Sequence, residues 1–424
     1  MTRGRDVFRA PKGTHDVLPP ESARWESVIA TFAERARRSG FGLVVSPVFE
    51  HVEVFHRVGE TTDVVSKEMY EFDDRGGRRL ALRPEGTAPV VRVFAQHRPP
   101  TPWKAWYLAP NFRYEQPQQG RYRQHWQLGV EVLGVDDPDV DVEVIALAHG
   151  FLADLGLEQV RLLVNSMGDE ESRTRYRTVL LDYLRAHADL IGADMPRAEA
   201  NPLRILDSKR DDWFEMLEHA PQLAEYLTDA SADHFERAQE GLRALAIEFT
   251  IAPRLVRGFD YYTGIAFEFV SDALDAAQST VCGGGRYDRL VEQMGGPPTP
   301  GIGFGMGVER LLIACSYEQI DPAAGRSGLD VFVVDAMGAG RLASVLVHEL
   351  RDAGLAADRA YGGRSLSKQW GAADKSGARF GVMLGARELE RNHVVVKDLT
   401  AGTQLEVRRD EIAAWLLTKR EQRS

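Results

Sequence analysis

The sequence predicts an α+β protein with an antiparallel sheet flanked by helices, a helical insertion, and a C-terminal α/β domain. Strand patterns dominate residues 79–134 and resume at Arg254. Between these regions, residues 172–245 have mostly helical patterns with breaks at Pro202 and Pro221, so they are interpreted as an insertion. Toward the C-terminus strands alternate with helices, as in an α/β domain. A chain of 424 residues is long for one core, so two or three domains are expected.

The N-terminal region is predicted to contain one long helix and one interrupted strand. A turn-rich stretch, residues 11–20, leads into a helix over residues 21–38 that ends at Ser39-Gly40. Its apolar residues recur at helical spacing on one stripe: Trp25, Ile29, Phe32 and Ala36. Residues 41–54 favour strand but are interrupted at Pro47, which predicts an edge strand or a bend.

Residues 105–115 and 123–133 are predicted to pair as an antiparallel hairpin. Because side chains alternate along a strand, the second strand has an apolar face made of Trp126, Leu128, Val130 and Val132. Its opposite face presents an amide, a gap and a carboxylate, from Gln127, Gly129 and Glu131. On the first strand, Arg113 and Glu115 share a face. The hairpin is therefore expected to bury one side and to display polar groups on the other.

The remaining elements follow from the same patterns. Residues 141–155 are predicted as a helix, residues 160–165 as a strand, and residues 305–315 as the opening of a helix. Residues 322–328 are predicted to form a linker. Beyond it, the predicted strands are residues 329–334, 379–384 and 394–398, and the predicted helices are residues 340–352, 367–376 and 411–419.

The composition is ordinary for a soluble globular protein, with 44% apolar and 27% charged residues. The chain has no apolar run long enough to span a bilayer and no secretory pattern, so a cytoplasmic location without a membrane partner is expected. Cys282 and Cys315 are the two cysteines, which argues against a disulfide framework and a cysteine-rich zinc site. The net charge of −11 argues weakly against a DNA-coating protein but allows a local basic surface.

Arginines near glycines are the strongest chemical signal in the chain. Arg286 follows three glycines, and Arg310 follows a Gly-x-Gly-x-Gly-x-Gly run that starts at Gly301. Arg113 precedes a polar loop that contains Gly120. A guanidinium group grips phosphate with two parallel hydrogen bonds, and glycines let the backbone approach a flat ligand. The pattern indicates a polyphosphate site, with structural ion pairs and tight strand packing as the alternative; the run is not a Walker loop.

A second set of residues could hold an amino acid. Glu85 and Thr87 follow a predicted strand, and Gln127 and Glu131 share one strand face. Together these groups could bind an ammonium group and a second polar donor; the alternative is a solvated sheet edge. Residues 257–262 form a dense polar and aromatic cluster, for which packed core tyrosines are the alternative.

The sequence contains none of the patterns expected of a zinc or serine hydrolase. Its histidines are scattered, without His-Glu-x-x-His spacing, and there is no Gly-x-Ser-x-Gly elbow. Cys282 adjoins a glycine run but has no base partner in the sequence, so a nucleophilic role is not expected.

Taken in order, the motifs resemble histidyl-tRNA synthetases, a family of class II aminoacyl-tRNA synthetases, over essentially the whole chain. The stretches similar to class II motifs 1, 2 and 3 are residues 21–55, 106–133 and 301–315. Residues 255–262 and 283–288 resemble two signatures specific to the histidine enzymes. Residues 83–87 and 201–209 also match the family.

The resemblance implies a class II catalytic domain over residues 1–325, with an insertion at about 170–250, and an anticodon-binding α/β domain over residues 329–424. It implies a histidine–tRNA ligase that makes histidyl-adenylate from L-histidine and ATP. The histidyl group then moves to the terminal adenosine of the cognate histidine tRNA. Mg²⁺ and a second copy of the chain are the further implied partners, since motif 1 forms a dimer interface in this class; zinc is not expected.

The resemblance also implies roles for individual residues. Arg113 and Arg257 would grip the α-phosphate and the substrate carboxylate as the catalytic pair. Histidine would be bound by Glu85, Gly86, Thr87, Arg113, Gln127, Glu131, Arg257, Tyr261 and Tyr262, with Glu131 and Tyr262 reading the imidazole nitrogens. ATP would be bound by Arg113, Glu115, Arg121, His125 and Arg310. The loop that meets the tRNA acceptor end would carry Gln116, Gln118, Gly120 and Arg121.

One position departs from the family, and two alternatives compete with this interpretation. His125 stands where the family usually has Phe as a flat surface for adenine, so the residue that stacks on adenine is left open; Trp126 should face the core. A non-catalytic paralogue that regulates ATP-phosphoribosyltransferase is disfavoured by the C-terminal α/β domain and by Arg113, Arg257 and Arg310. A class II synthetase for another amino acid is disfavoured by the two histidine-specific stretches.

Overall fold

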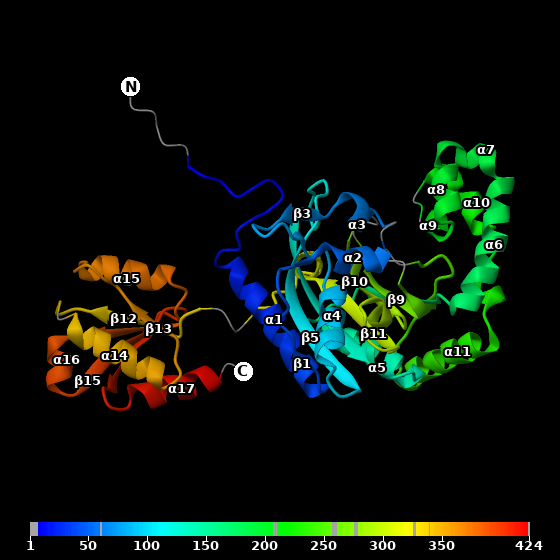
Figure 1. Ribbon diagram of the computed structural model, residues 1–424. Coiled ribbons are helices and arrows are strands. Elements are labelled where there is room, and N and C mark those ends of the chain that lie inside the picture. The colour runs from blue at the N-terminus through cyan, green and yellow to red at the C-terminus, as the bar shows by residue number, and fades with distance from the viewer. Residues whose placement is uncertain are drawn as a thin grey trace, which may run out of the picture. The chain divides into compact units, whose positions relative to one another are not determined.

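The computed structural model describes residues 7–59, 62–206, 208, 210–256, 261–274, 279–324, 328–338 and 340–422. The chain divides into two compact units, Met1–Ala323 and Ala324–Ser424, each with its own hydrophobic core (Figure 1). The first unit holds an antiparallel sheet, helices and a helical insertion, and the second is an α/β unit. The predicted fold class is confirmed.

The first unit is built on an eight-stranded sheet with the order β1-β5-β6-β11-β10-β9-β7-β8. Its strands are β1 (Gly42–Leu43), β5 (Trp103–Phe112), β6 (Gln124–Leu133), β7 (Val160–Ser166), β8 (Thr250–Ile251), β9 (Thr263–Ser271), β10 (Thr280–Arg286) and β11 (Gly301–Gly307). Neighbouring strands are antiparallel except the edge pairs β1–β5 and β7–β8. The sheet places motif 2 directly beside motif 3, because β6 pairs with β11.

One face of this sheet is covered by α1 (Glu21–Arg38), α5 (Pro138–Asp154), α11 (Asp229–Ala244) and α13 (Val308–Tyr317). The predicted α1 stripe is largely buried there, and the Phe32 ring packs edge-on against Phe151 and Phe304. Burying a large apolar side chain contributes about 1.5–3 kcal/mol, so these contacts fix the helix on the sheet. Trp126 packs against Trp25 on this face, as the strand alternation predicts.

The other face is covered by a small sheet and four short helices. The three-stranded sheet has the order β2-β4-β3, formed by β2 (Phe49–His51), β4 (Arg79–Leu82) and β3 (Tyr70–Asp73). The helices are α2 (Val52–Gly59), α3 (Asp63–Lys67), α4 (Thr87–His97) and α12 (Leu290–Gln293). The odd-numbered positions of β6, including Gln127 and Glu131, face this side.

The insertion is a helical lobe with a core of its own (Figure 1). It contains α6 (Glu170–Ala186), α7 (Ala188–Ile191), α8 (Met195–Ala200), α9 (Leu203–Leu206) and α10 (Phe214–Glu218), with short 3₁₀ turns at Gly192–Asp194, Asp211–Trp213 and Leu223–Tyr226. Tyr176, Leu180 and Trp213 are buried within it. The lobe therefore has packing that is separate from the main sheet.

The second unit is a five-stranded sheet with the order β13-β12-β14-β15-β16. Its strands are β12 (Val331–Asp335), β13 (Ala357–Arg359), β14 (Phe380–Leu384), β15 (His393–Asp398) and β16 (Gln404–Arg408). Its helices are α14 (Arg341–Asp352), α15 (Leu366–Lys375), α16 (Ala386–Glu390) and α17 (Ile412–Glu421). β13, α16 and β16 were not predicted; β13 and α16 are short, and β16 is mostly exposed, so none has a strong apolar pattern.

Two local predictions in the first half of the chain were wrong in extent. Residues 41–54 form only the short strands β1 and β2, and helix α2 already begins at Val52 because Val52 and Phe55 turn into the core at helical spacing. Strand β5 ends at Phe112 rather than at residue 115. Beyond it, the Tyr114 N–H donates to Glu68 O, away from β6, so Arg113 and Glu115 do not share a strand face.

The glycine run was predicted to open a helix at residue 305, which is also wrong. Gly301–Gly307 is strand β11, and the helix begins at Val308. The intervening residues Ile302, Phe304 and Met306 are buried in the main core. These apolar side chains alternate with glycines, so the strand period was present but had side chains on one face only.

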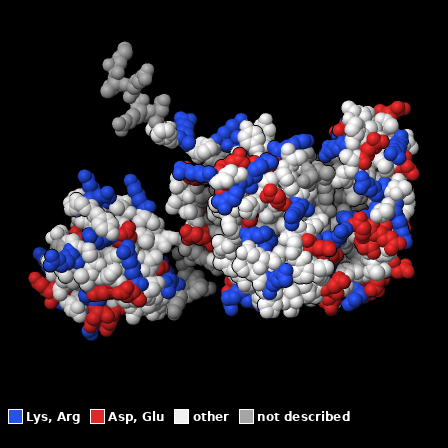
Figure 2. All heavy atoms as spheres, viewed as in Figure 1, with Lys and Arg blue, Asp and Glu red and all other residues white. Residues whose placement is uncertain are grey.

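The described residues include no helix long and apolar enough to cross a membrane. Basic and acidic side chains are interspersed over the visible surface of each unit (Figure 2). The face in view is therefore not covered by charge of one sign.

Candidate active site

Several segments that are distant in the sequence converge on a cavity of about 210 Å³. They are the loop between β5 and β6 (residues 113–123, called the motif 2 loop), β6, β10, β11 and the first turn of α13. The lining residues are Arg113, Glu115, Gly120, Arg121, Tyr122, His125, Gln127, Thr280, Val281, Cys282, Gly283, Gly305, Gly307, Glu309 and Arg310. The structure thus brings together all five residues of the expected ATP set.

Arg310 is held in place by two backbone carbonyl groups. Its Nε donates to Gly120 O at 3.2 Å, and its Nη1 donates to Thr280 O at 3.0 Å. Burial, followed by the positive charges of Arg121 and Arg113, lowers the pKa of Arg310. An arginine keeps its charge under these conditions, so three cations face one small space. Such a space is suited to the negative charge of a polyphosphate.

Glu115 lies among these cations. Its Oε2 is 3.2 Å from Arg121 Nε. Burial raises the pKa of Glu115, although the charges of Arg121 and Arg113 oppose the increase. Arg113 Nε donates to Pro84 O at 2.9 Å, which ties this arginine to the segment that carries Glu85.

His125 presents an uncharged, flat ring to the cavity. It lies on β6 opposite Asn111. Burial, then the charges of Arg113 and Arg310, lowers the pKa of His125 to about 3. The imidazole is therefore neutral near pH 7 and can stack on a purine without adding repulsion.

The glycines of β11 make room for two polar side chains of β6. Gly303 pairs with Glu131. Gly305 pairs with Gly129, the β6 residue midway between Gln127 and Glu131. A Cβ on Gly305 would lie 1.7 Å from Gln127 Nε2, and a Cβ on Gly303 would lie 1.8 Å from Glu131 Oε2. Gln127 is fixed further by Asn111, whose Nδ2 donates to Gln127 Oε1 at 2.6 Å. The glycine spacing therefore allows an amide and a carboxylate to lie flat over the sheet.

Glu131 is a fully buried carboxyl group on the same face of β6. Thr87 Oγ1 donates to its Oε1 at 2.7 Å, and the hydroxyl of Tyr287 donates to its Oε2. Burial raises the pKa of Glu131 well above its usual range in spite of these bonds. A ligand N–H or cation beside the carboxylate would offset that penalty. Tyr287 was not predicted as a site residue; its place in the 283–288 signature was the available signal.

Glu85 and Gly86 shape the adjacent start of α4. Glu85 Oε2 accepts a hydrogen bond from Thr87 N at 2.7 Å, and its Oε1 accepts one from Ala88 N at 2.6 Å. Burial raises the pKa of Glu85. A Cβ on Gly86 would lie 2.2 Å from Tyr107 Cε2, so a side chain there would meet the tyrosine ring. The carboxylate thus binds the helix N-terminus while it remains close to Thr87.

Two tyrosines complete this region. Tyr261 and Tyr262 are buried, with ring centroids 4.6 Å apart, and Tyr261 packs edge-on against Tyr287 at 5.8 Å. Arg257, the other member of the expected catalytic pair, lies outside the described residues. The expected histidine-binding residues that are described therefore lie just after β5, on β6, at the start of α4 and just before β9.

The motif 2 loop projects away from these buried groups. Gln116 and Gln118 are exposed, and Gln118 pairs with Arg121 through backbone hydrogen bonds in both directions. Gly120 has a φ of 71° and bonds to Arg310 through its carbonyl oxygen, so the loop is tied to α13. The loop thus connects an exposed surface with the cavity.

Arg286, in the second histidine-specific stretch, is placed in the protein core. It is 2% exposed, and its Nη2 lies 2.6 Å from Asp141 Oδ1. Asp141 also lies 2.7 Å from His234 Nε2, and Arg286 pairs with Asp288 at 3.2 Å. This network joins β10 to α5 and α11 and does not line the cavity.

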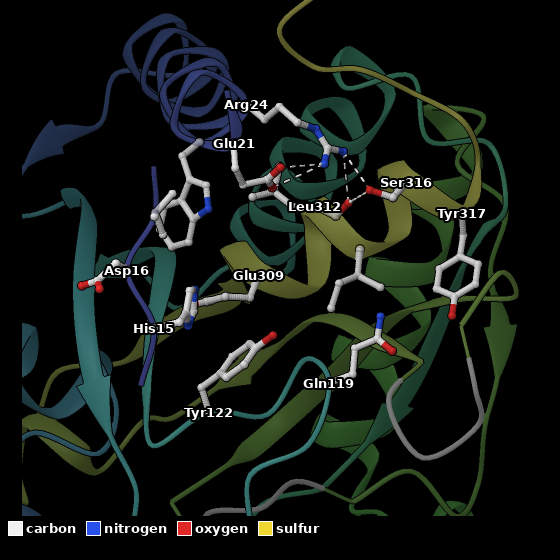
Figure 3. Close-up of a pocket in the computed structure, with 13 residues that line it drawn as sticks. His15, Asp16, Glu21, Arg24, Gln119, Tyr122, Glu309, Leu312, Ser316 and Tyr317 are labelled. Atoms are coloured by element: carbon white, nitrogen blue, oxygen red, sulfur yellow. Dashed lines mark hydrogen bonds and ion pairs between the residues drawn. The ribbon is translucent and has the colours of Figure 1, made fainter. Parts of the chain in front are cut away.

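A second cavity of about 460 Å³ adjoins the first and shares Tyr122 and Glu309 with it (Figure 3). It is lined by His15, Asp16, Val17, Glu21, Arg24, Trp25, Gln119, Tyr122, Glu309, Leu312, Ile313, Ser316 and Tyr317. The Glu309 carboxylate accepts a hydrogen bond from Trp126 N at 2.9 Å, and burial raises its pKa to about 7. Glu309 therefore links β6 to α13; sequence reasoning did not single it out.

Among the described residues, no group of three or more His, Cys, Asp or Glu side chains is arranged to hold a metal ion. The carboxylate of Glu115 nevertheless lines the cavity beside the arginines. Mg²⁺ commonly binds through one or two carboxylates together with substrate phosphates. The donor set fits an ion that is held mainly by the nucleotide.

Comparisons with known proteins match two parts of the chain to described families. Residues 13–311 match the family model described as histidyl-tRNA synthetase, and residues 331–419 match an anticodon binding domain model. A histidine–tRNA ligase of Geobacillus thermodenitrificans is 46% identical over 427 residues, which cover 98% of this chain and 100% of the relative.

Solved structures show the same fold. The apo histidyl-tRNA synthetase of S. aureus has a TM-score of 0.81 and 35% identity, covering 97% of this chain and 100% of that one. A Bacillus halodurans protein described as an ATP phosphoribosyltransferase regulatory subunit/histidyl-tRNA synthetase has a TM-score of 0.61 and 23% identity. It covers 83% of this chain and 93% of its own. At that identity the likeness shows the fold alone.

Proposed function

This chain belongs to the histidyl-tRNA synthetase family, and we propose that ATP binds in its arginine-lined cavity while histidine binds beside Glu131. The chain is a histidine–tRNA ligase: it uses ATP to activate L-histidine and joins the amino acid to tRNA. It carries an anticodon-binding domain in addition to the catalytic unit. The residue assignments that follow are part of the proposal.

Neither step of the reaction needs a nucleophilic side chain. The carboxylate of histidine attacks the α-phosphorus of ATP, and the bond to the leaving pyrophosphate breaks with its electron pair on the bridging oxygen. A hydroxyl of the terminal adenosine of tRNA then attacks the carbonyl carbon of histidyl-adenylate and releases AMP. Rate enhancement comes from in-line placement and from neutralising charge at phosphorus.

The arginines are assigned to the phosphates. Arg113 would contact the α-phosphate and the attacking carboxylate, together with Arg257, whose assignment rests on the resemblance alone. Arg121 and Arg310 would neutralise the rest of the chain of phosphates, and the neutral ring of His125 would stack on adenine. Mg²⁺ would withdraw charge from the phosphate oxygens when bound, and Glu115, which lines the cavity beside the arginines, would hold it.

The buried groups around Glu131 are assigned to histidine. Glu131 and Tyr262 would each take one imidazole nitrogen, while Glu85, Thr87 and Gln127 would hold the α-ammonium group. Gly86 and Tyr261 would shape the pocket wall. A site that satisfies both ring nitrogens rejects amino acids that leave its polar groups unpaired.

The tRNA is proposed to contact the protein in three places. The C-terminal unit, taken as residues 329–424, would bind the anticodon region, and the insertion would contact the acceptor arm. Gln116, Gln118, Gly120 and Arg121 would meet the acceptor end, which fits the exposure of this loop. The proposed location is the cytoplasm, where the tRNA is charged.

A homodimer is proposed through motif 1. Phe49 and Phe72 are 51% and 43% exposed and contact each other across the small sheet, with ring centroids 6.3 Å apart. Val45, in the same region of the chain, is 82% exposed. Apolar side chains grouped on one surface commonly mark an interface. Sedimentation velocity should therefore give a dimer, which Phe49→Asp weakens.

The convergence of motif 2 and motif 3 arginines on one cavity, on the sheet that carries Glu131, is the observation that carries the assignment. The test is ATP–pyrophosphate exchange by the purified chain with each standard amino acid in turn. Exchange that depends on histidine is expected. Exchange that depends on another amino acid, or none with any, would overturn the assignment.

A further inference from the structure

A side chain of the helical insertion reaches the proposed histidine site. Arg173 lies in the first turn of α6, and its Nη1 donates to Tyr262 O at 2.9 Å. Tyr262 is buried and directly precedes β9. A residue of the insertion therefore holds the backbone of a residue proposed to read the imidazole.

The base of the insertion is well fixed at this point. Gly264, two residues after Tyr262, exchanges backbone hydrogen bonds with the segment that enters the insertion, from Met167 N at 2.5 Å and to Gly168 O at 3.0 Å. Asp169 caps α6 and accepts a hydrogen bond from Thr228 Oγ1 at 2.5 Å, where the chain leaves the insertion. Arg173 thus projects from a rigid platform.

The position of the Tyr262 backbone determines the position of its ring. A Cβ on Gly285 would lie 2.8 Å from Tyr262 Cδ1, so the ring lies against bare backbone of β10. The ring also packs against Tyr261, with ring centroids 4.6 Å apart. The hydrogen bond from Arg173 to the carbonyl oxygen is a further restraint on the position of the phenol hydroxyl.

The guanidinium group of Arg173 serves two partners at once. While Nη1 binds Tyr262 O, Nη2 donates to Glu170 Oε2 at 3.1 Å. Glu170 also lies 3.5 Å from Arg289 Nη1, close after Tyr287 in the chain. A lysine has one nitrogen and cannot reproduce this planar arrangement.

We propose that Arg173 is a positioning residue for histidine recognition. Through Arg173, the insertion holds Tyr262 where its side chain can bind the imidazole of histidine. The inference rests on the proposed function of the Glu131 region. It implies that a displacement of the insertion changes affinity for histidine before it changes affinity for ATP.

The test compares full-length Arg173→Met, Arg173→Lys and Arg175→Met with the wild-type chain. Arg175 is the matched control, because it lies on the same helix and pairs with Glu171 on the surface. The readouts are KM for histidine, KM for ATP and kcat in pyrophosphate exchange, with thermal melting of each protein. Arg173→Met should raise KM for histidine about tenfold with an unchanged KM for ATP, Arg173→Lys less, and Arg175→Met not at all.

Other outcomes would overturn the inference. An unchanged KM for histidine in Arg173→Met, equal increases in both KM values, or the same effect in Arg175→Met would each do so. If Arg173→Met does not fold, Arg173→Lys decides, since a wild-type KM for histidine in that variant contradicts the positioning role. A wild-type chain without histidine-dependent exchange would instead refute the proposed function.

Discussion

A Cβ on Gly305 would lie 1.7 Å from Nε2 of Gln127, so the amide occupies the space that any other residue at 305 would fill. The two residues come from motifs 3 and 2, which the chain separates widely. The relationship explains why a strand at the centre of the sheet carries glycine at alternate positions. The polar side chains of Gln127 and Glu131, on the neighbouring strand β6, occupy the space beside these glycines.

Gly305→Ala should therefore impair histidine binding without unfolding the protein. The added methyl group meets the flexible end of Gln127, which can swing away, so the fold is retained. KM for histidine in pyrophosphate exchange should rise by about tenfold or more, as a displaced ammonium ligand costs a charged hydrogen bond. Gly307→Ala is the matched control for folding and histidine affinity, because a Cβ there meets Arg310 only at 4.0 Å. Equal KM values in the two variants would contradict the role given to Gln127.

Glu131→Gln should lower the activity of the enzyme without lowering its stability. The amide keeps the shape of the side chain but removes a carboxyl group whose ionisation is opposed by burial. The melting temperature should stay the same or rise, because no charge then has to be buried. Histidine-dependent exchange should fall by about a hundredfold or more, on the order of the loss of a key polar contact in an active site. Wild-type exchange in this variant would remove Glu131 from the site.

His125→Phe should make the protein less sensitive to acid. Burial lowers the pKa of His125 to about 3 in the folded state, against an ordinary value of 6.5. Between these values the unfolded chain binds a proton that the folded chain does not, so stability falls as pH decreases below 6.5. Between pH 7 and pH 5, the free energy of unfolding of the variant should therefore decrease by about 1–2 kcal/mol less than that of the wild type. Urea unfolding at both pH values measures the difference, and parallel losses in the two proteins would count against a neutral His125.

Arg286→Met should destabilise the catalytic unit strongly. It leaves Asp141 buried with one partner fewer, and breaking a buried ion pair costs about 3–5 kcal/mol. Arg161→Met is the control, because its pair with Asp272 is exposed and such pairs contribute about 0–1 kcal/mol. Chemical denaturation of the two variants should show this contrast. Similar losses would mean that Arg286 does not hold β10 to α5.

Elements with a dense apolar period could be predicted from the sequence, and elements without one could not. Helix α1 was predicted with its observed bounds because Trp25, Phe32 and Ala36 mark one buried stripe. The last three residues of strand β11 were mistaken for the start of a helix, since half of the strand's positions have no side chain to show the alternation. The start of helix α2 was not predicted, because the residues before it favour strand and the predicted strand was extended to residue 54.

The candidate site was predictable where motif residues line one cavity, as with Arg113, Arg121 and Arg310. It was not predictable where the essential fact is a contact between distant segments. The hydroxyl of Tyr287 on Glu131 and the carboxylate of Glu309 on Trp126 N depend on strand register, which no local pattern records. For Arg286 the sequence pattern was misleading. The residue lies in a histidine-specific stretch beside glycines, but the structure places it in the core and not in the cavity.

The closely joined ends of the insertion have an evolutionary consequence. The chain departs at Asp169 and returns at Thr228, where hydrogen bonds from Thr228 to Asp169 and Ser172 close the loop. An appendage attached through so narrow a neck can be lengthened, shortened or exchanged while β7 and α11 keep their places. We therefore expect the lobe beyond the first turn of α6, which carries Arg173, to be the part of this enzyme that varies most readily among species as their tRNAs diverge.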